Sequence, residues 1–93
     1  MSNDAYELVL ARPARQAIAD KLPPAVAEAA VEFITGPLLE NPRRVGKSLR
    51  EPLAGVYSAR FGTNWRVLYE IDDVTNIITV LDIRARSEAY KQR

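Results

Sequence analysis

Hydrophobic positions along this chain of 93 residues follow a helical spacing in its first half and a strand-like alternation in its second half. Residues 6–11 (YELVLA) are short, rich in apolar side chains and bounded by polar sequence, which is typical of a strand. Between residues 13 and 34, apolar side chains recur three and four positions apart and predict helices. From residue 56 onward, the pattern favours strands.

Prolines divide the helical part of the chain. Pro13 suits the first turn of a helix, where its missing N–H costs nothing. The Pro23–Pro24 pair ends this helix and begins a second one, which Gly36–Pro37 interrupts and Asn41–Pro42 closes. A short link between two helices predicts an antiparallel helical hairpin. The apolar faces of the two predicted helices are Ala14, Ala17, Ile18 and Leu22, and Val26, Ala29, Ala30, Phe33 and Ile34.

The second half of the chain predicts a meander of three strands. Residues 42–55 contain two prolines and two glycines among basic residues and are expected to form a loop. The order βααβββ predicts an α+β fold in a single domain covering residues 1–93. In it, a helical hairpin packs on one face of an antiparallel-rich sheet, and a short C-terminal segment follows. The predicted strands are 56–61, 65–71 and 76–83, with turns at 62–64 and 72–75.

Composition excludes several kinds of chemistry. The chain has neither cysteine nor histidine, so it has no thiolate nucleophile, no disulfide and no Ser–His pair, and a zinc site is not expected. No glycine-rich nucleotide-binding loop is present, and Asp72–Asp73 suits a turn better than a metal site. We therefore expect no metal and no cofactor. Without a signal-like start or a long apolar run, the sequence favours a cytoplasmic protein with no membrane contact.

Charge is distributed unevenly along the chain, although the net charge is only +1. Residues 1–40 carry a net charge of −3, residues 41–66 carry +5 and residues 67–93 carry −1. The basic middle segment could bind a polyanion locally, or it could be a solvated basic face.

Four arginines are the strongest candidates for an anion site. Arg60 and Arg66 lie near the facing ends of two predicted strands, and Arg84 and Arg86 follow the last one. If the meander pairs as expected, these side chains converge on one side of the sheet, where guanidinium groups suit phosphate oxygens. Each arginine alone could be an ordinary surface residue. For the set this alternative is weaker, because Arg66 interrupts an otherwise apolar strand.

Cleavage of RNA needs no histidine, because the RNA 2′-hydroxyl is an internal nucleophile. A protein needs only to orient that hydroxyl, neutralise the phosphorane and move protons, and one positioned donor is worth about 2.7–4 kcal/mol of barrier. Tyr90, six residues beyond Arg84, has an ordinary pKa of about 10, and nearby cations would favour its phenolate. Tyr90 could then act as a general base or stack on a base. An ordinary core or surface tyrosine is the alternative.

Three runs of the chain resemble the RelE toxins of bacterial toxin–antitoxin pairs, in particular actinobacterial members. The likeness extends over nearly the whole chain, and its ending, Arg84-x-Arg86-Ser87-Glu88-x-Tyr90, is similar to that of the mRNA-cleaving members. The runs are Leu53–Arg60 (LAGVYSAR), Trp65–Ile71 (WRVLYEI) and Ile83–Tyr90 (IRARSEAY).

The resemblance implies an endoribonuclease that enters the ribosomal A site and cleaves the mRNA codon by attack of a 2′-hydroxyl on its own 3′ phosphate. Arg66 would then stabilise the pentavalent phosphate, Arg84 would support the leaving 5′ oxygen, and Tyr90 would assist activation of the 2′-hydroxyl. Arg60 occupies a position that is lysine in the best-known members and would act as a charge stabiliser. RNA-binding roles are expected for Lys47, Arg50 and Arg86.

One position departs from the family pattern. Ser58 stands where a second lysine of the site is expected, and a serine cannot supply that positive charge. Lys47 and Arg50, from the preceding segment, could compensate for the missing charge.

The resemblance also implies partners. These are a cognate RelB-like antitoxin that blocks the cationic site, the ribosome and its mRNA, and DNA only indirectly through the antitoxin. Two other functions stay open. The chain could be a ParE-like inhibitor of DNA gyrase without nuclease activity, or a catalytically weak module that only binds its antitoxin.

Overall fold

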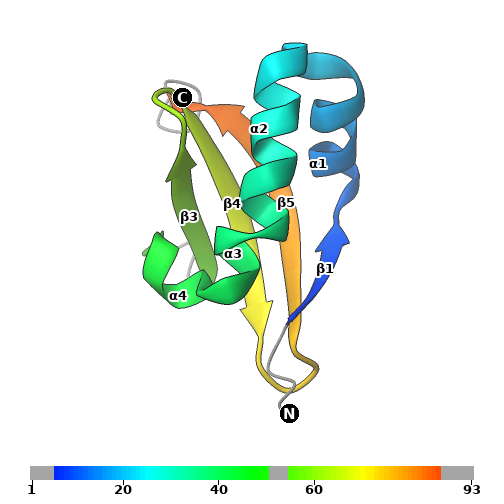
Figure 1. The fold of residues 1–93 in the computed structure, drawn as a ribbon. Helices are drawn as coiled ribbons and strands as arrows, with labels where there is room; N and C mark the ends of the chain where they lie inside the picture. Colours follow the sequence, from blue (N-terminus) through cyan, green and yellow to red (C-terminus); the bar gives the residue numbers. More distant parts are fainter. Residues whose placement is uncertain (1–5, 51–54, 87–93) are drawn as a thin grey trace.

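A five-stranded mixed sheet organises the computed structural model, which describes residues 6–50 and 55–86. The spatial order of the strands is β1-β5-β4-β3-β2, so the last strand of the chain lies inside the sheet and the first lies at its edge (Figure 1). The strands are β1 (Glu7–Leu10), β2 (Gly46–Ser48), β3 (Val56–Phe61), β4 (Trp65–Asp72) and β5 (Ile77–Ala85).

Strand pairing is parallel at one place and antiparallel elsewhere. β1 runs parallel to β5 with Glu7 opposite Ile77, whereas β2–β3, β3–β4 and β4–β5 are antiparallel. A parallel neighbour requires a crossover connection, and the helical hairpin begins that connection. The predicted α+β class, with a helical hairpin on an antiparallel-rich sheet, is therefore confirmed.

Prolines begin the helices. Pro13 and Pro24 do so as the sequence predicts, whereas Pro37 and Pro42, which were expected to interrupt and to close the second helix, each begin a short helix. Each α-helix has proline at its first or second position, where no N–H partner is lost. A π-helical turn continues α1 and ends at Leu22, whose extended backbone (ψ 144°) is the conformation favoured before a proline. The helical segments are α1 (Arg12–Gln16), η1 (Ala17–Lys21), α2 (Pro24–Thr35), α3 (Pro37–Glu40) and α4 (Pro42–Val45).

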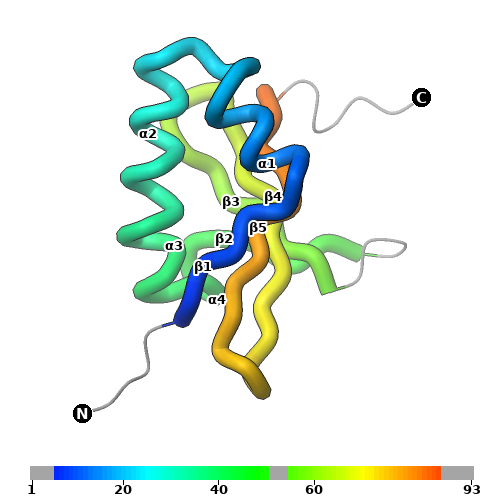
Figure 2. The backbone as a smooth tube through the Cα atoms, turned by 90° about the vertical axis from the view of Figure 1, so that its right-hand side faces the viewer, coloured from blue at the N-terminus to red at the C-terminus, as the bar shows by residue number. Residues whose placement is uncertain are grey.

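The core lies between the helices and one face of the sheet. Figure 2 shows α2 and α3 standing beside the strands on that side. Phe33 of α2 stacks on Phe61 of β3 with ring centroids 5.9 Å apart, which joins the hairpin to the sheet. The fully or nearly buried residues are Ala14, Ala17, Ala30, Ile34, Leu38, Ala59, Phe61, Val67, Tyr69, Ile78, Val80 and Ile83.

The expected loop over residues 42–55 is wrong for its first half. Residues 42–48 form α4 and the edge strand β2, which pairs with β3. Long-range contacts hold them in place: the hydroxyl of Tyr69, 0% exposed, donates a 2.5 Å hydrogen bond to the Pro42 carbonyl. Gly46 permits this approach, because a Cβ there would overlap the Tyr69 hydroxyl and lie 3.0 Å from the Ser58 carbonyl oxygen.

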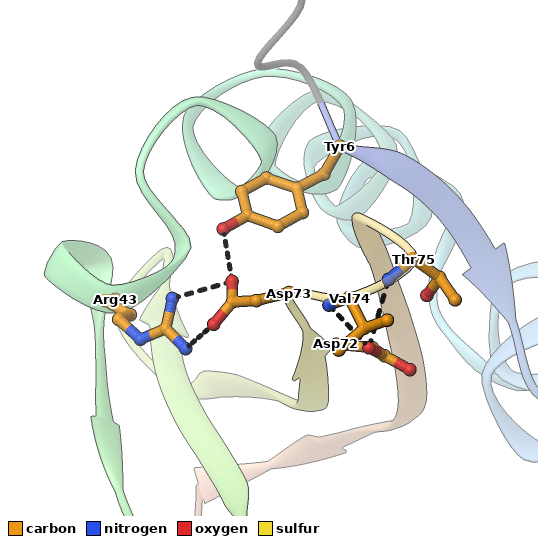
Figure 3. Close-up of polar contacts among 6 residues, drawn as sticks. All are labelled: Tyr6, Arg43, Asp72, Asp73, Val74 and Thr75. Carbon is orange, nitrogen blue, oxygen red and sulfur yellow. Dashed lines mark hydrogen bonds and ion pairs between the residues drawn. The ribbon is translucent and has the colours of Figure 1, made fainter.

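An exposed ion pair ties the turn between β4 and β5 to α4 and to the start of β1 (Figure 3). The Asp73 carboxylate accepts hydrogen bonds from both terminal nitrogens of Arg43, at 3.2 and 2.6 Å, and from the Tyr6 hydroxyl at 2.9 Å. The Arg43 guanidinium, followed by the Tyr6 hydroxyl, lowers the pKa of the Asp73 carboxyl. Within the turn, the Asp72 carboxylate accepts the backbone N–H groups of Val74 and Thr75, so Asp72 stabilises the turn, as predicted, while Asp73 bonds to other parts of the chain.

No helix among the described residues combines the length and the apolar character needed to cross a membrane.

We predict that Tyr69→Phe destabilises the protein more than Tyr6→Phe. Burial raises the pKa of the Tyr69 phenol to about 12, in keeping with a hydroxyl that stays protonated and donates to Pro42. Its removal leaves a buried carbonyl without this donor, at a cost of about 1–3 kcal/mol. The Tyr6 hydroxyl bond is exposed and should cost less. Urea unfolding of both variants measures the difference, and equal losses would contradict it.

The Asp73 ion pair should stabilise the fold in a pH-dependent way. In the folded protein the pKa of the Asp73 carboxyl lies below its ordinary value of 3.8. The stabilisation by the ion pair is therefore complete above a pH of 3.8 and is lost as the pH falls through the lowered pKa. Near neutral pH, Asp73→Asn should therefore unfold at a lower urea concentration than wild type. The difference between the two midpoints should disappear at acidic pH. Unfolding midpoints from a pH of about 6 down to about 2.5 test this. Asp20→Asn, which changes an exposed aspartate in η1, is the control.

Candidate functional site

Three arginines occupy one straight row across the sheet. Arg60 of β3 lies directly opposite Arg66 of β4, and Arg66 lies directly opposite Arg84 of β5. Directly opposed residues share a face, with Cβ atoms about 4.5–5.5 Å apart. The structure therefore brings together three of the four residues predicted as catalytic; we call them the arginine row.

The arginine row lies on the sheet face opposite the helices. Its neighbours along the three strands, Ala59, Val67 and Ile83, are buried in the core, and successive side chains of a strand point to opposite faces. Arg60 and Arg84 are exposed, whereas Arg66, in the centre, is half-buried. The row lies close to the β3–β4 turn, at the end of the sheet away from the β4–β5 turn (Figure 1).

A second row on the same face supplies hydrogen-bond acceptors to the arginines. Lys47, Ser58, Leu68 and Asp82 oppose one another across β2, β3, β4 and β5. The Ser58 hydroxyl oxygen accepts a hydrogen bond from Nη1 of Arg66 at 2.7 Å. The Asp82 carboxylate accepts one from Nε of Arg84, also at 2.7 Å.

A surface cavity of about 310 Å³ adjoins the row beside β2. Its lining carries four cationic side chains and two apolar side chains, Val45 before β2 and Leu49 after it, a composition that suits a phosphate group with part of a nucleoside. The residues are Arg44, Val45, Gly46, Lys47, Leu49, Ser58, Arg60 and Arg66. Sequence analysis missed Arg44, because the α4–β2 unit that carries it was expected to be a loop. Its only sequence signal was its place in the basic segment.

The other predicted site residues lie in different settings. Arg84 belongs to β5, rather than following the last strand as expected. Arg86 comes after β5, is exposed, and its backbone N–H donates to the Asn64 carbonyl of the β3–β4 turn at 2.6 Å. Lys47 lines the cavity, whereas Arg50 is exposed beyond β2 and does not line it. Tyr90 lies outside the described residues.

Ser58 has a place in the site despite its lack of charge. Ser58 is only 6% exposed, and its hydroxyl accepts a hydrogen bond from Arg66, the central arginine of the row. The position expected to carry a lysine therefore supplies an acceptor for Arg66. Lys47, directly opposite Ser58 on β2, brings a positive charge to the same place.

The chemistry that this arrangement permits is recognition of an anion. Across residues 6–50 and 55–86, no group of three or more acidic side chains converges to hold a metal ion. Clustered guanidinium groups instead offer many N–H donors to phosphate oxygens and stabilise negative charge that develops during a reaction.

The sequence and the fold of this chain are similar to those of known bacterial toxins. A family model described as the ParE toxin of type II toxin-antitoxin system, parDE, matches residues 10–90. Toxin RelE of Mycobacterium tuberculosis is 48% identical over 71 residues, which cover 76% of this chain and 72% of that protein. Toxin RelG of the same organism is 47% identical over 72 residues, covering 77% and 82% of the two chains.

Solved structures agree with these sequence matches. The toxin–antitoxin complex RelBE2 of M. tuberculosis matches with a TM-score of 0.82 and 43% identity, over 88% of this chain and 99% of that chain. A variant of E. coli toxin RelE in the free state matches with a TM-score of 0.71 and 25% identity, over 92% and 87%. The chain belongs to the RelE/ParE superfamily of toxins from type II toxin–antitoxin systems, and within it is a RelE-type member.

We predict that the arginine row costs folding stability. Arg60→Gln should raise the free energy of unfolding at low ionic strength, because like charges directly opposed across strands destabilise by roughly 0.2–1 kcal/mol. The gain should shrink as salt screens the row. Urea unfolding at several salt concentrations measures this. Arg12→Gln, which changes an exposed arginine of α1, is the control and should show no such salt-dependent gain.

Proposed function

We propose that this toxin is a ribosome-dependent endoribonuclease that cleaves mRNA in the A site and so inhibits translation. The scissile phosphate would be attacked by the adjacent 2′-hydroxyl. The observation that carries this proposal is the arginine row, three guanidinium groups on directly opposed positions of a face that no described helix covers. Such a cluster is electrostatically unfavourable by itself and becomes favourable when an anion binds.

Arg66 is the proposed stabiliser of the pentavalent phosphate. It lies between Arg60 and Arg84 and is half-buried, so its charge is less screened by water than a fully exposed one. Arg84, at one end of the row, would support the leaving 5′ oxygen. Arg60, at the other end, would add charge stabilisation, since an arginine does not give up its proton as a base. Tyr90 keeps its proposed role in activating the 2′-hydroxyl and stacking on the codon.

Binding of the RNA strand would use basic residues around the row. Lys47 and Arg44 line the cavity beside Arg60 and Arg66, and we add Arg44 to the proposed RNA contacts. Arg50 and Arg86 are exposed at the edge of the same region and would contact phosphates further along the strand. Phosphate contacts of this kind fix the position of the RNA without reading its sequence.

A cognate RelB-like antitoxin is the proposed partner that controls the activity, in the cytoplasm where ribosomes are found. Support comes from a related M. tuberculosis toxin solved as a toxin–antitoxin complex with RelB. An acidic segment of the antitoxin laid over the arginine row would both hide the site and relieve its charge repulsion. DNA would be reached only through the antitoxin.

A ParE-like inhibitor of DNA gyrase without nuclease activity is the second candidate. The name of the matching family model favours it. The 48% identity to a protein named RelE favours the nuclease.

Toeprinting of an mRNA on programmed 70S ribosomes tests the nuclease. Wild-type toxin should produce cuts inside the A-site codon, and Arg66→Ala and Arg84→Ala should reduce the cleavage rate by about a hundredfold or more, the usual effect of removing one positioned charge donor. Tyr90→Phe should also lose activity.

Arg12→Ala removes the same charge from α1, on another part of the surface, and should cleave like wild type. Intact mRNA together with inhibited gyrase supercoiling would overturn the proposal in favour of the second candidate.

A further inference from the structure

The arginine row is held by acceptors whose position in the sheet is itself fixed. Asp82 precedes Arg84 by two residues on β5, so both side chains lie on the same face, and the two form a 2.7 Å ion pair. The other carboxylate oxygen of Asp82 accepts the backbone N–H of Ile83 at 2.8 Å. Both oxygens are thus engaged, one by the backbone and one by Arg84.

The open edge of β5 explains why this backbone group is available. β1 ends at Leu10, opposite Val80, so beyond that point no described strand pairs with β5 on the side away from β4. The Ile83 N–H has Asp82 as its partner instead of a neighbouring strand. The Asp82 side chain is 23% exposed, and a carboxylate anchored in this way presents a fixed acceptor to Nε of Arg84.

Ser58 holds Arg66 in a corresponding way. Ser58 is buried next to the row, and its hydroxyl oxygen accepts a hydrogen bond from Nη1 of Arg66 at 2.7 Å. The guanidinium group of Arg60, by contrast, makes no hydrogen bond or ion pair with any described residue. Arg66 and Arg84, which are proposed to stabilise the phosphate and the leaving oxygen, are therefore the two members of the row that donate hydrogen bonds to side-chain acceptors.

We propose that Asp82 and Ser58 are positioning residues, which hold the guanidinium groups of Arg84 and Arg66 in the orientation that the reacting phosphate requires. This inference rests on the proposed nuclease function. A guanidinium has five N–H donors, so one bond to Asp82 leaves four of those of Arg84 for phosphate oxygens. Fixing a long side chain before the substrate arrives lowers the entropy lost in the transition state.

Simple electrostatics makes the opposite prediction for Asp82. A carboxylate beside a cationic site weakens its attraction for RNA, so its removal should strengthen RNA binding and leave cleavage unchanged or faster. If Asp82 positions Arg84, Asp82→Ala should lower the maximal cleavage rate by roughly ten- to a hundredfold, the scale of a misplaced catalytic group. The toxin concentration at half saturation should stay the same or fall.

The experiment measures single-turnover cleavage of mRNA on programmed 70S ribosomes against toxin concentration. Glu70→Ala is the matched control. It removes an exposed carboxylate that lies on the same face of β4 as Arg66 but four residues further along the strand. This variant should keep the wild-type maximal rate. Ser58→Ala should lower the maximal rate, and Ser58→Thr, which keeps the hydroxyl and suits a strand, should restore it.

A second measurement separates this inference from the nuclease proposal. In NMR spectra of the free toxin, the Arg84 Nε–H proton should exchange with water more slowly than that of Arg60, and Asp82→Ala should raise it to the Arg60 rate. Equal exchange in wild type and Asp82→Ala would overturn the positioning role whether or not the protein cleaves RNA. So would an unchanged maximal rate in Asp82→Ala while Arg84→Ala is inactive.

Discussion

Burial of alternate residues along β4 is the constraint on which the rest of the structure depends. Val67 and Tyr69 are completely buried against the helical hairpin, and this alternation requires Arg66 to point the other way. A slip of one residue would turn the arginine into the core and both apolar side chains into water. The same hydrophobic packing that stabilises the fold therefore fixes the centre of the charged row, and the pairing of β3 and β5 with β4 aligns the other two arginines with it.

The two ends of the sheet use charge in opposite ways. At the β4–β5 turn, Asp73 is matched by Arg43 and by the Tyr6 hydroxyl, and the contacts join three separate parts of the chain. Near the β3–β4 turn, the three arginines of the row form an ion pair with only one carboxylate of the described residues, that of Asp82. A protein can keep such an imbalance only if stability comes from elsewhere, here from the apolar core and from the buried Tyr69–Pro42 bond. The unmatched charge is concentrated where a polyanionic ligand would neutralise it.

Local sequence patterns were sufficient to predict the long strands and helices, but not the short ones. Strand 56–61 is found as predicted, and a tight turn after it was enough to bring Arg60 and Arg66 together. The three residues of β2 are too few to show a period, and they form a strand because β3 lies beside them and because Gly46 admits the Tyr69 hydroxyl. For the same reason Arg44 was missed. The acceptor role of Ser58 was also invisible, because it depends on the register between β3 and β4, which the sequence does not state.

The place of β5 in the sheet has a consequence for how the molecule folds. Its parallel pairing joins Glu7 to Ile77, a separation of 70 residues, and β5 also pairs with β4 along its whole length. Closing so large a loop costs entropy before any contact repays it, which slows folding relative to a chain of local contacts. The strands β3, β4 and β5 are joined by short turns and can pair early, but the sheet stays incomplete until β1 pairs with β5. The arginine row, including Arg84 and the neighbouring Asp82, lies entirely on this meander, so the site can assemble before the edge strand completes the sheet.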